Sequence, residues 1–318
     1  MIFFSEKTII PIGGTTASGK SAVAAELAVA LEGEVVNADG LQLYKNLPIL
    51  TAHPGEGMRE IVKHHLYGVL ECNEPSSAAD WLDLLAVCLE DNNTANAFIT
   101  TGGTGLFFSS LLYGLSSIPN ISDSVRFQVR QQGKSIIAAS GEPALYACVV
   151  KKDPLIAGRI HPHHIQHLLR AWEVIEQTGV SIFQWQKEPR RKVEYHRAPL
   201  FVIDCNRDEL QDRIERRFKE MIEAGVFEEV RLLRDSTMGK FFPIHKAVGY
   251  QEIKRHLDGE WSLEETIEEV VKNTCQYAKR QQTWFRTQYQ AGDIVLIPPD
   301  SPQGQASMIL KKLCSLNS

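Results

Sequence analysis

The stretch that most constrains this 318-residue chain is "GGTTASGKS", residues 13–21. It contains G-x-x-x-x-G-K-S, from Gly14 to Ser21, which is the spacing of a phosphate-binding loop. Residues 8–14 before it read as a short buried strand, although Pro11 is unfavourable in a central strand. Residues 20–31 after it read as a helix. This order of strand, glycine-rich turn and helix predicts a phosphate site.

The residue types in this loop suit an anion. Backbone N–H groups can wrap a phosphate, Lys20 adds a positive charge, and Ser21 offers a hydroxyl to magnesium. The helix that follows directs the positive end of its dipole to the same place. The alternative is a glycine turn capped by Ser18 or Ser21. The expected phosphate contacts are Gly14, Thr15, Thr16, Ala17, Ser18, Gly19, Lys20 and Ser21.

Strand and helix signals alternate in both end regions of the chain. This alternation predicts an α/β fold: a parallel sheet flanked by helices, like the core of P-loop NTPases. From about 118 to 198 the sequence is mainly helical. We therefore expect a core domain of 1–117 and 199–318 and a helical insertion domain of 118–198. The expected strands are 8–14, 33–39, 95–105, 199–204 and 293–298, and the expected helices are 20–31, 81–92, 207–235 with a break near Gly225, and 262–288.

Composition narrows the class of protein. The hydrophobic share of 43% and the charged share of 23% are ordinary for a soluble globular chain. The net charge of −5 excludes a global positive field, so any surface for nucleic acid must be local. The six cysteines are far apart and form no C-x-x-C pair, which argues against a zinc ribbon or a disulfide scaffold. With no signal-peptide pattern and no long apolar run, we expect a cytoplasmic protein without membrane contact.

The identity of the phosphate depends on nearby carboxylates. A P-loop ATPase usually places an aspartate after a second buried strand to hold magnesium. Here "AFITTGGTG", residues 97–105, ends in threonines and glycines. Asp39 instead follows the strand at 33–39, and the carboxyl ends of parallel strands line the ligand crevice. We expect Asp39 to face the phosphate site, with a cap on the next turn as the alternative. Phosphoryl transfer and another reaction on a di- or triphosphate both stay open at this point.

Four stretches resemble the bacterial tRNA dimethylallyltransferases, also called tRNA isopentenyltransferases. In order along the chain they read "GGTTASGKS", "NADGLQLYKNLPILTAHP", "TGGTGLFFSSLLYGL" and "YAKRQQTWFR". The resemblance extends from about residue 9 to about residue 290. It implies that the loop holds the diphosphate of dimethylallyl diphosphate, with magnesium. It also implies that the prenyl group passes to the exocyclic amine of the adenosine on the 3′ side of the anticodon, in tRNAs that read codons starting with U.

The resemblance also assigns three catalytic residues. Asp39 is implied to orient the amine and to accept its proton, as a general base does. Thr104 is implied to border the reacting adenine or the diphosphate, and Arg126 to lie near the diphosphate and the tRNA. The alternative readings are a helix N-cap for Thr104 and a solvated helix face, shared with Arg130, for Arg126.

Local charge supports an RNA partner. Residues 151–200 contain nine Lys/Arg and five Asp/Glu, and residues 271–291 contain four Lys/Arg and no acid. Aromatic residues interleave with the second group, which suits phosphate contacts and base stacking, although Trp284 and Phe285 can equally be core residues. The expected contacts to the tRNA anticodon stem-loop are Asp39, Gly40, Leu41, Gln42, Thr104, Arg126, Gln166, Arg170, Lys246, Gly249, Tyr250, Lys279 and Arg280.

One segment departs from the family pattern, and other functions stay open. In "RIHPHHIQHLLRAWEV", His163, His164 and His167 replace Asn, Asp and Arg of the pattern, and chelation of a metal is the alternative reading. Three other functions are a P-loop small-molecule kinase or ATPase, an isopentenyltransferase acting on free adenine nucleotides, and a non-catalytic RNA-binding protein. The insertion and the basic segment favour a tRNA substrate, while the intact loop and Asp39 argue against a decayed site. We expect a monomer.

Overall fold

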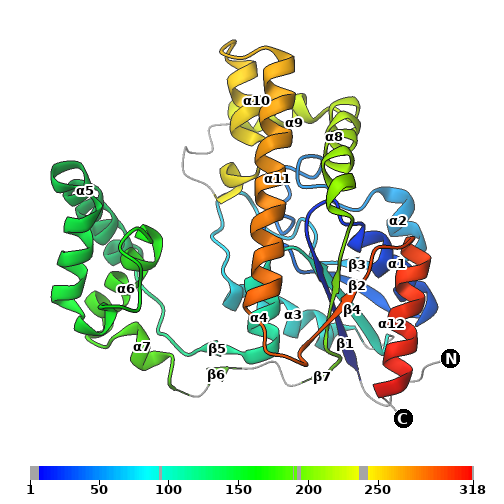
Figure 1. Ribbon diagram of the computed structural model, residues 1–318, viewed down its shortest axis with the longest axis horizontal. Helices are drawn as coiled ribbons and strands as arrows, with labels where there is room; N and C mark the ends of the chain where they lie inside the picture. The colour runs from blue at the N-terminus through cyan, green and yellow to red at the C-terminus, as the bar shows by residue number, and fades with distance from the viewer. Residues whose placement is uncertain (1–6, 93–94, 189, 192–194, 236–242, 317–318) are drawn as a thin grey trace. The chain divides into compact units, whose positions relative to one another are not determined.

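The computed structural model describes residues 7–92, 95–188, 190–191, 195–235 and 243–316. The chain divides into two compact units, Met1–Leu112 with Val193–Ser318 and Tyr113–Lys192 (Figure 1). The second unit starts and ends earlier than the predicted insertion, 118–198. The reason is that β5 (Leu115–Ser116) pairs antiparallel with β6 (Arg190–Arg191). The two chain segments that lead into and out of the second unit therefore count as part of that unit.

The first unit is built on a parallel sheet in the order β3-β2-β4-β1-β8-β9, with β7 also paired to β1. The strands are β1 (Thr8–Gly14), β2 (Glu34–Asn37), β3 (His64–His65), β4 (Ala97–Gly102), β7 (His196–Arg197), β8 (Leu200–Ile203) and β9 (Ile294–Ile297). Every pairing in this sheet is parallel. The predicted α/β fold with a parallel sheet flanked by helices is confirmed.

Pro11 lies in the central strand β1, although proline is unfavourable in such a strand. On one side, β1 pairs with β4 from Thr8 to Gly13. On the other side, β1 pairs with β7 through Thr8 and Ile9 and with β8 from Ile12 onward. Pro11 therefore lies between two stretches of pairing on that side. This position tolerates its missing N–H.

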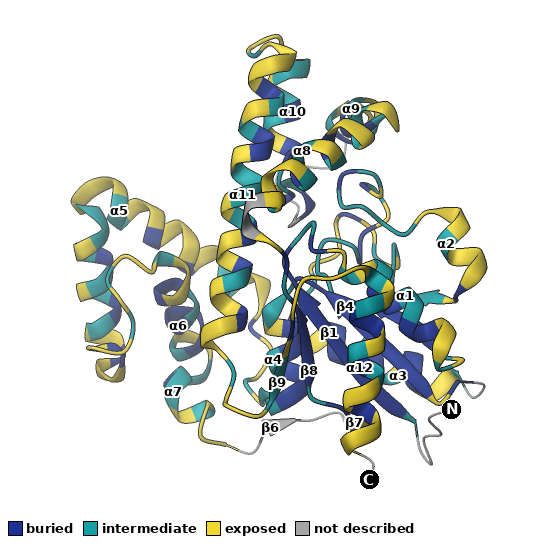
Figure 2. Ribbon diagram, turned by 45° about the vertical axis from the view of Figure 1, so that its right-hand side comes forward, coloured by how far each residue is buried: buried dark blue, intermediate teal, exposed yellow. Residues whose placement is uncertain are grey.

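Helices cover both faces of the sheet, whose strands are largely buried (Figure 2). The helices of the first unit are α1 (Lys20–Ala30), α2 (Glu56–Ile61), α3 (Ala78–Asp91), α4 (Gly105–Tyr113), α8 (Arg207–Glu223), α9 (Val226–Asp235), the 3-10 turn η2 (Pro243–Lys246), α10 (Tyr250–Leu257), α11 (Leu263–Thr287) and α12 (Pro302–Leu316). Ile10 and Ile12 of β1 share one apolar cluster with residues of α1 and α12. Gly13 instead faces Phe285 of α11, on the other side of the strand. Among the described residues, no helix combines the length and the apolar composition needed to span a bilayer.

Four helices, α8 to α11, stand together at one end of the sheet (Figure 1). The predicted break near Gly225 is confirmed: α8 ends before it, α9 begins after it, and Gly225 has a φ of 95°. A left-handed backbone conformation of this kind favours glycine. An apolar cluster that includes Phe218, Val230, Tyr250 and Val270 holds the four helices together.

The second unit is mainly helical, as the sequence predicts. Its helices are α5 (Asp123–Lys152), the 3-10 turn η1 (Pro154–Ile156), α6 (Ile165–Thr178) and α7 (Ile182–Trp185). Helix α5 is interrupted at Gly141, whose φ is 77°, two residues before Pro143. Val129, Leu145 and Trp172 belong to the apolar core of this unit.

The carboxyl edge of the sheet is where three segments meet. A Cβ at Gly102, the last residue of β4, would lie 2.1 Å from the carbonyl oxygen of Ala38 and 2.8 Å from the nitrogen of Asp39. Only a residue without a side chain permits this approach of backbone to backbone. The phosphate loop, Asp39 and the turn at 103–104 are therefore neighbours because β1, β2 and β4 are adjacent strands.

We expect Gly102→Ala to destabilise the protein because the new methyl group meets rigid backbone at Ala38. The free energy of unfolding should fall by about 1–3 kcal/mol, the usual cost of overpacking. Gly57→Ala is the control, because a Cβ at Gly57 in α2 meets no atom within 4 Å. It should be neutral or stabilising by up to about 1 kcal/mol. Urea unfolding measures both, and equal stability of the two variants would contradict the argument.

Candidate active site

A cavity opens beyond the carboxyl edge of the sheet. The phosphate loop, the segment after β2 and helices α8 and α11 line it, through residues that include Thr16, Lys20, Asp39, Arg217 and Gln281. A second cavity shares Lys20, Ser21, Thr101 and Arg217 with the first. Two cations therefore face both spaces, and Asp39 faces the first.

The start of helix α1 leaves N–H groups of the phosphate loop available to a ligand, although the N–H of Thr16 already donates to Gln281 and that of Ser18 to the carbonyl oxygen of Thr15. Helix α1 begins at Lys20 after Gly19, which has a φ of 88° and provides no side-chain cap. The first N–H groups of a helix have no partner inside the helix and attract anions. The hydroxyl of Ser18 is buried and, among the described residues, has no hydrogen-bond partner. The same holds for Thr101, which lines both cavities.

Lys20 is positioned by the loop itself. Its Nζ donates a hydrogen bond to the carbonyl oxygen of Thr15, at 3.0 Å. Burial lowers the pKa of Lys20 to about 8, and the charge of Asp39 works in the opposite direction. Arg217 nearby also lowers this pKa. A bound anion would favour the charged form of Lys20 and would compensate for its burial.

Arg217 is a site residue that the sequence reasoning missed. It lies on α8, and its Nη1 donates a hydrogen bond to Oγ1 of Thr16, at 3.1 Å. Both cavities include it in their walls. Its neighbour Arg216 is exposed. In the sequence, nothing marks one of these two adjacent arginines as the residue that contacts the phosphate loop. Only the contact with a loop 201 residues away distinguishes Arg217.

Gln281 is a second residue that the reasoning missed, although it lies inside the quoted motif "YAKRQQTWFR". Its Oε1 accepts a hydrogen bond from the N–H of Thr16 at 2.8 Å, and its Nε2 donates to the carbonyl oxygen of Gly103 at 3.0 Å. A Cβ at Gly103 would lie 2.1 Å from that Nε2. The buried amide of Gln281 thus ties the phosphate loop to the glycine turn after β4.

Asp39 faces the cavity and also organises the turn that follows it. Its N–H donates to Oδ1 of Asn37 at 2.8 Å, and its own Oδ1 accepts from the N–H of Leu41 at 3.0 Å. Asp39 therefore lines the cavity wall and also caps the turn that follows, while its catalytic role stays a prediction. Among the described residues, its Oδ2 has no hydrogen-bond partner and is left for a ligand.

Thr104 joins this arrangement from the turn after β4. Its Oγ1 accepts a hydrogen bond from the N–H of Gly40 at 3.0 Å. The hydroxyl therefore bridges to the residue after Asp39. Its role in catalysis stays a prediction.

The predicted RNA contacts of the first unit differ in accessibility. Lys246, Lys279 and Arg280 are exposed. Gly249 and Tyr250 are buried: Tyr250 is 3% exposed and belongs to the cluster under α8 to α11. We assign these two residues packing roles, and their contacts with tRNA stay predictions. Gly40, Leu41 and Gln42 form the turn beside Asp39, and Leu41 and Gln42 line the first cavity.

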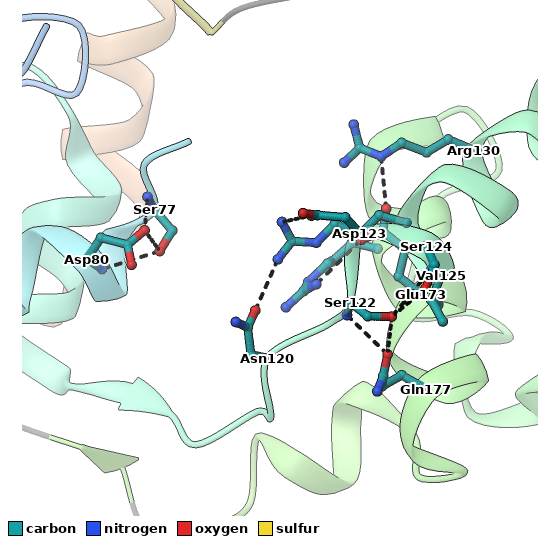
Figure 3. Close-up of polar contacts among 12 residues, drawn as sticks. Ser77, Asp80, Asn120, Ser122, Asp123, Ser124, Val125, Arg130, Glu173 and Gln177 are labelled. Carbon is teal, nitrogen blue, oxygen red and sulfur yellow. Dashed lines mark hydrogen bonds and ion pairs between the residues drawn. The ribbon is translucent and has the colours of Figure 1, made fainter. Parts of the chain in front are cut away.

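The basic residues predicted in the second unit are partly paired with acids (Figure 3). The buried carboxylate of Glu173 contacts Arg130 at 2.9 Å and Arg170 at 3.4 Å. Arg126 lies 3.8 Å from Asp123.

Gln166 is exposed on α6. The contacts of Gln166, Arg126 and Arg170 with diphosphate or tRNA stay predictions. In the histidine-rich segment, Nδ1 of His163 lies 2.5 Å from Oε2 of Glu142.

The aromatic pair at the end of α11 divides between core and surface. Phe285 is 2% exposed, so the core reading of Phe285 is confirmed. Trp284 is 36% exposed, and its indole lies over Gly105, where a Cβ would come within 2.0 Å of Cδ1.

The residues at the loop fit a magnesium ion that is held mainly by phosphate and water. Within the described part of the chain, no three His, Cys, Asp or Glu side chains gather as a metal site. Magnesium usually keeps several waters and binds through few protein oxygens and the phosphates of a substrate. The exposed Ser21 and the unpartnered hydroxyl of Thr101 both line the shared wall of the cavities.

Three comparisons place the chain among known proteins. The model of the family described as IPP transferase matches residues 42–288. The tRNA dimethylallyltransferase of Paramagnetospirillum magneticum is 40% identical over 283 residues, which are 89% of each chain. That of Allorhizobium ampelinum is 41% identical over 282 residues, covering 88% of this chain and 91% of the other.

Two solved structures share the fold. The tRNA isopentenylpyrophosphate transferase of Bacillus halodurans is 29% identical with a TM-score of 0.65 and covers 98% of each chain. A eukaryotic dimethylallyltransferase acting on tRNA is 25% identical with a TM-score of 0.77 and covers 98% of this chain and 80% of its own.

We expect Gln281→Leu to destabilise the protein by about 2–4 kcal/mol, since the buried carbonyl of Gly103 and the half-buried N–H of Thr16 lose their partner. Affinity for inorganic diphosphate should fall as well, because the N–H of Thr16 loses its acceptor and only the Arg217 contact still holds this residue. Gln282→Leu, one residue along α11 and half-buried, is the matched control and should stay within about 0.5 kcal/mol of wild type. Urea unfolding and calorimetric titration with diphosphate test both variants. A Gln281→Leu protein as stable as the control would refute this role.

Proposed function

This chain belongs to the IPP transferase family, and we propose that it acts as a tRNA dimethylallyltransferase. In this proposal it transfers a dimethylallyl group from dimethylallyl diphosphate to the exocyclic amine of the adenosine 3′-adjacent to the anticodon, in tRNAs that read codons starting with U. Diphosphate is released. The N–C bond forms at the allylic carbon while the C–O bond to the diphosphate breaks, and the amine loses one proton. We expect the enzyme to act as a monomer in the cytoplasm.

The observation that supports this reaction best is the mixture of charges at one cavity. Lys20, Arg217 and the N–H groups of the loop suit a diphosphate, and Asp39 lines the same cavity with a free Oδ2. The strand beside the loop, β4, ends in Thr100, Thr101 and Gly102 and not in the aspartate typical of an ATPase. A site with an anion cradle and one carboxylate suits the displacement of diphosphate by an amine.

The donor side stabilises charge on the leaving group. As the C–O bond breaks, negative charge grows on the diphosphate, and fixed N–H donors and cations lower the energy of that state. Gln281 and Arg217 hold Thr16 in place from α11 and α8, so the loop is preorganised for this charge. Magnesium, when bound through Ser21 and phosphate oxygens, would add positive charge at the same leaving group.

The acceptor side must orient a weakly basic aromatic amine. Asp39 is fixed by its Oδ1 contact with Leu41, so its Oδ2 can accept a hydrogen bond from the amine and then its proton. Thr104 supports the turn through Gly40. The amine thereby meets the carboxylate on the same cavity wall as the donor loop.

The tRNA surface follows from the exposed cations. Lys246, Lys279 and Arg280 are exposed in the first unit, and the second unit adds Gln166, which is exposed, and Arg170, which is half-exposed. Lysine and arginine contacts to phosphate supply most of the affinity for RNA and weaken with salt. We assign these residues to the anticodon stem-loop.

One assay separates this function from its alternatives. The protein is incubated with labelled dimethylallyl diphosphate and an unmodified tRNA whose anticodon loop carries three adjacent adenosines. Label in the RNA supports the proposal. Label in free adenine nucleotide, phosphate release from ATP alone, or tRNA binding without turnover would each support a different function and refute this one.

We expect Asp39→Ala to lower kcat by about 10²–10⁴-fold, the usual contribution of a general base. Asp80→Ala is the control, because Asp80 caps α3 through Ser77 and does not line the cavity. Steady-state rates with saturating donor and tRNA measure the effect. Turnover of the Asp39 variant within threefold of wild type would contradict the assigned role.

Donor affinity should depend on pH through Lys20. Its lowered pKa of about 8 means that the side chain loses its charge in the free protein as pH rises past 8. Diphosphate favours the charged form, so binding takes up a proton above that pH and weakens there. The Kd for dimethylallyl diphosphate should be flat near pH 7 and about tenfold higher at pH 9. Lys20→Arg stays charged over this range, so an equal pH slope in that variant would argue against Lys20 as the titrating group.

A further inference from the structure

We propose that Glu229 of α9 is a positioning residue for the acceptor side of the cavity. It acts through the turn at residues 47–52, which lines the cavity and holds Gln42. The inference rests on the proposed function, since it concerns how the acceptor meets Asp39. Glu229 itself contacts the backbone of Ile49 and Leu50 and neither the phosphate loop nor Asp39.

Glu229 binds the turn with both carboxylate oxygens. Oε1 accepts a hydrogen bond from the N–H of Ile49 at 2.7 Å, and Oε2 accepts from the N–H of Leu50 at 2.9 Å. Hydrogen bonds to a charged acceptor are stronger than neutral ones. Burial raises the pKa of Glu229, and the two amide bonds oppose that change. A half-buried carboxylate is thus kept here with the backbone of the turn as its partner.

The turn at residues 47–52 also binds the side chain of Gln42. Nε2 of Gln42 donates to the carbonyl oxygens of Thr51 and Ala52, at 2.8 and 2.9 Å. A side-chain amide nitrogen has two hydrogens, so both are committed to the turn. The orientation of Gln42 therefore depends on where the turn lies. Gln42 lies three residues after Asp39, and both line the first cavity.

The cavity wall includes the turn itself. Leu50, Thr51 and Ala52 line the first cavity together with Asp39. Leu50 is buried in the cluster under α8 to α11, and a Cβ at Gly249 would lie 2.9 Å from its Cδ1. Apolar packing thus sets the depth of the turn, while the carboxylate of Glu229 fixes its backbone. The phosphate loop is held separately, by Gln281 and Arg217.

Helix α9 offers a matched control in the adjacent carboxylate. Glu228 and Glu229 both lie in the first turn of α9. Glu228 is exposed and pairs with Arg231 at 2.7 Å. The changes Glu228→Gln and Glu229→Gln remove the same charge from the same helix end. Only the second removes an acceptor from the turn.

The test compares the two variants of the full chain. Glu229→Gln should lower kcat/KM for the anticodon-loop tRNA by about 10- to 100-fold, since one acceptor oxygen becomes an N–H donor that faces the N–H of either Ile49 or Leu50. The Kd for dimethylallyl diphosphate, measured without tRNA, should stay within about twofold of wild type because the loop is anchored elsewhere. Glu228→Gln should leave both quantities within about twofold of wild type.

A third variant tests whether a general loss of stability, and not the lost contact with the turn, lowers the activity. Ile309→Ala in α12 removes a buried side chain far from the turn in the fold and should cost about 2–5 kcal/mol of stability. At a temperature where Glu229→Gln and Ile309→Ala are both folded, Ile309→Ala should keep the wild-type kcat/KM for tRNA.

The inference is overturned if Glu229→Gln keeps kcat/KM, if its donor Kd weakens to the same degree, or if Ile309→Ala loses as much activity. No prenyl transfer by the wild-type chain would instead remove the proposed function and this inference together.

Discussion

The approach of backbone to backbone at the carboxyl edge of the sheet is the constraint on which the site depends. Gly102 ends β4 so close to Ala38 that a Cβ would lie 2.1 Å from its carbonyl oxygen. Because no side chain intervenes, Asp39 reaches the turn that carries Thr104, and Oγ1 of Thr104 accepts the N–H of Gly40 at 3.0 Å. The relation between the carboxylate and the phosphate loop is thus set by adjacent strands before any charged side chain is considered.

The lining of the first cavity carries more positive than negative charge. Lys20 and Arg217 face it beside a single carboxylate, Asp39. Keeping charged groups away from water is costly unless they are paired. The lowered pKa of Lys20 expresses that cost. A diphosphate supplies further negative charge, which accounts physically for two half-buried cations in a cavity whose described lining includes one acid.

The second unit shows how composition alone overstates free positive charge. Nine basic residues between 151 and 200, all but Arg197 in this unit, predicted an RNA surface. In the structure, Glu173 is 1% exposed and contacts both Arg130 and Arg170. Lys152 likewise pairs with Glu176 at 2.9 Å. The cations are present, but part of their charge is already balanced by acids that the helices of this unit bring to them.

The sequence by itself determined the phosphate loop, the five longest strands with the helices α1, α3, α8, α9 and α11, the break at Gly225 and the family, because each is written in local spacing or in ordered motifs. The place of Asp39 also followed, since carboxyl ends of parallel strands share one edge. Only the tertiary structure revealed the roles of Arg217, Gln281 and Glu229. Their partners lie 201, 265 and about 180 residues away along the chain. Helical periodicity shows which face a residue occupies, but it carries no record of the distant backbone group that the face will meet.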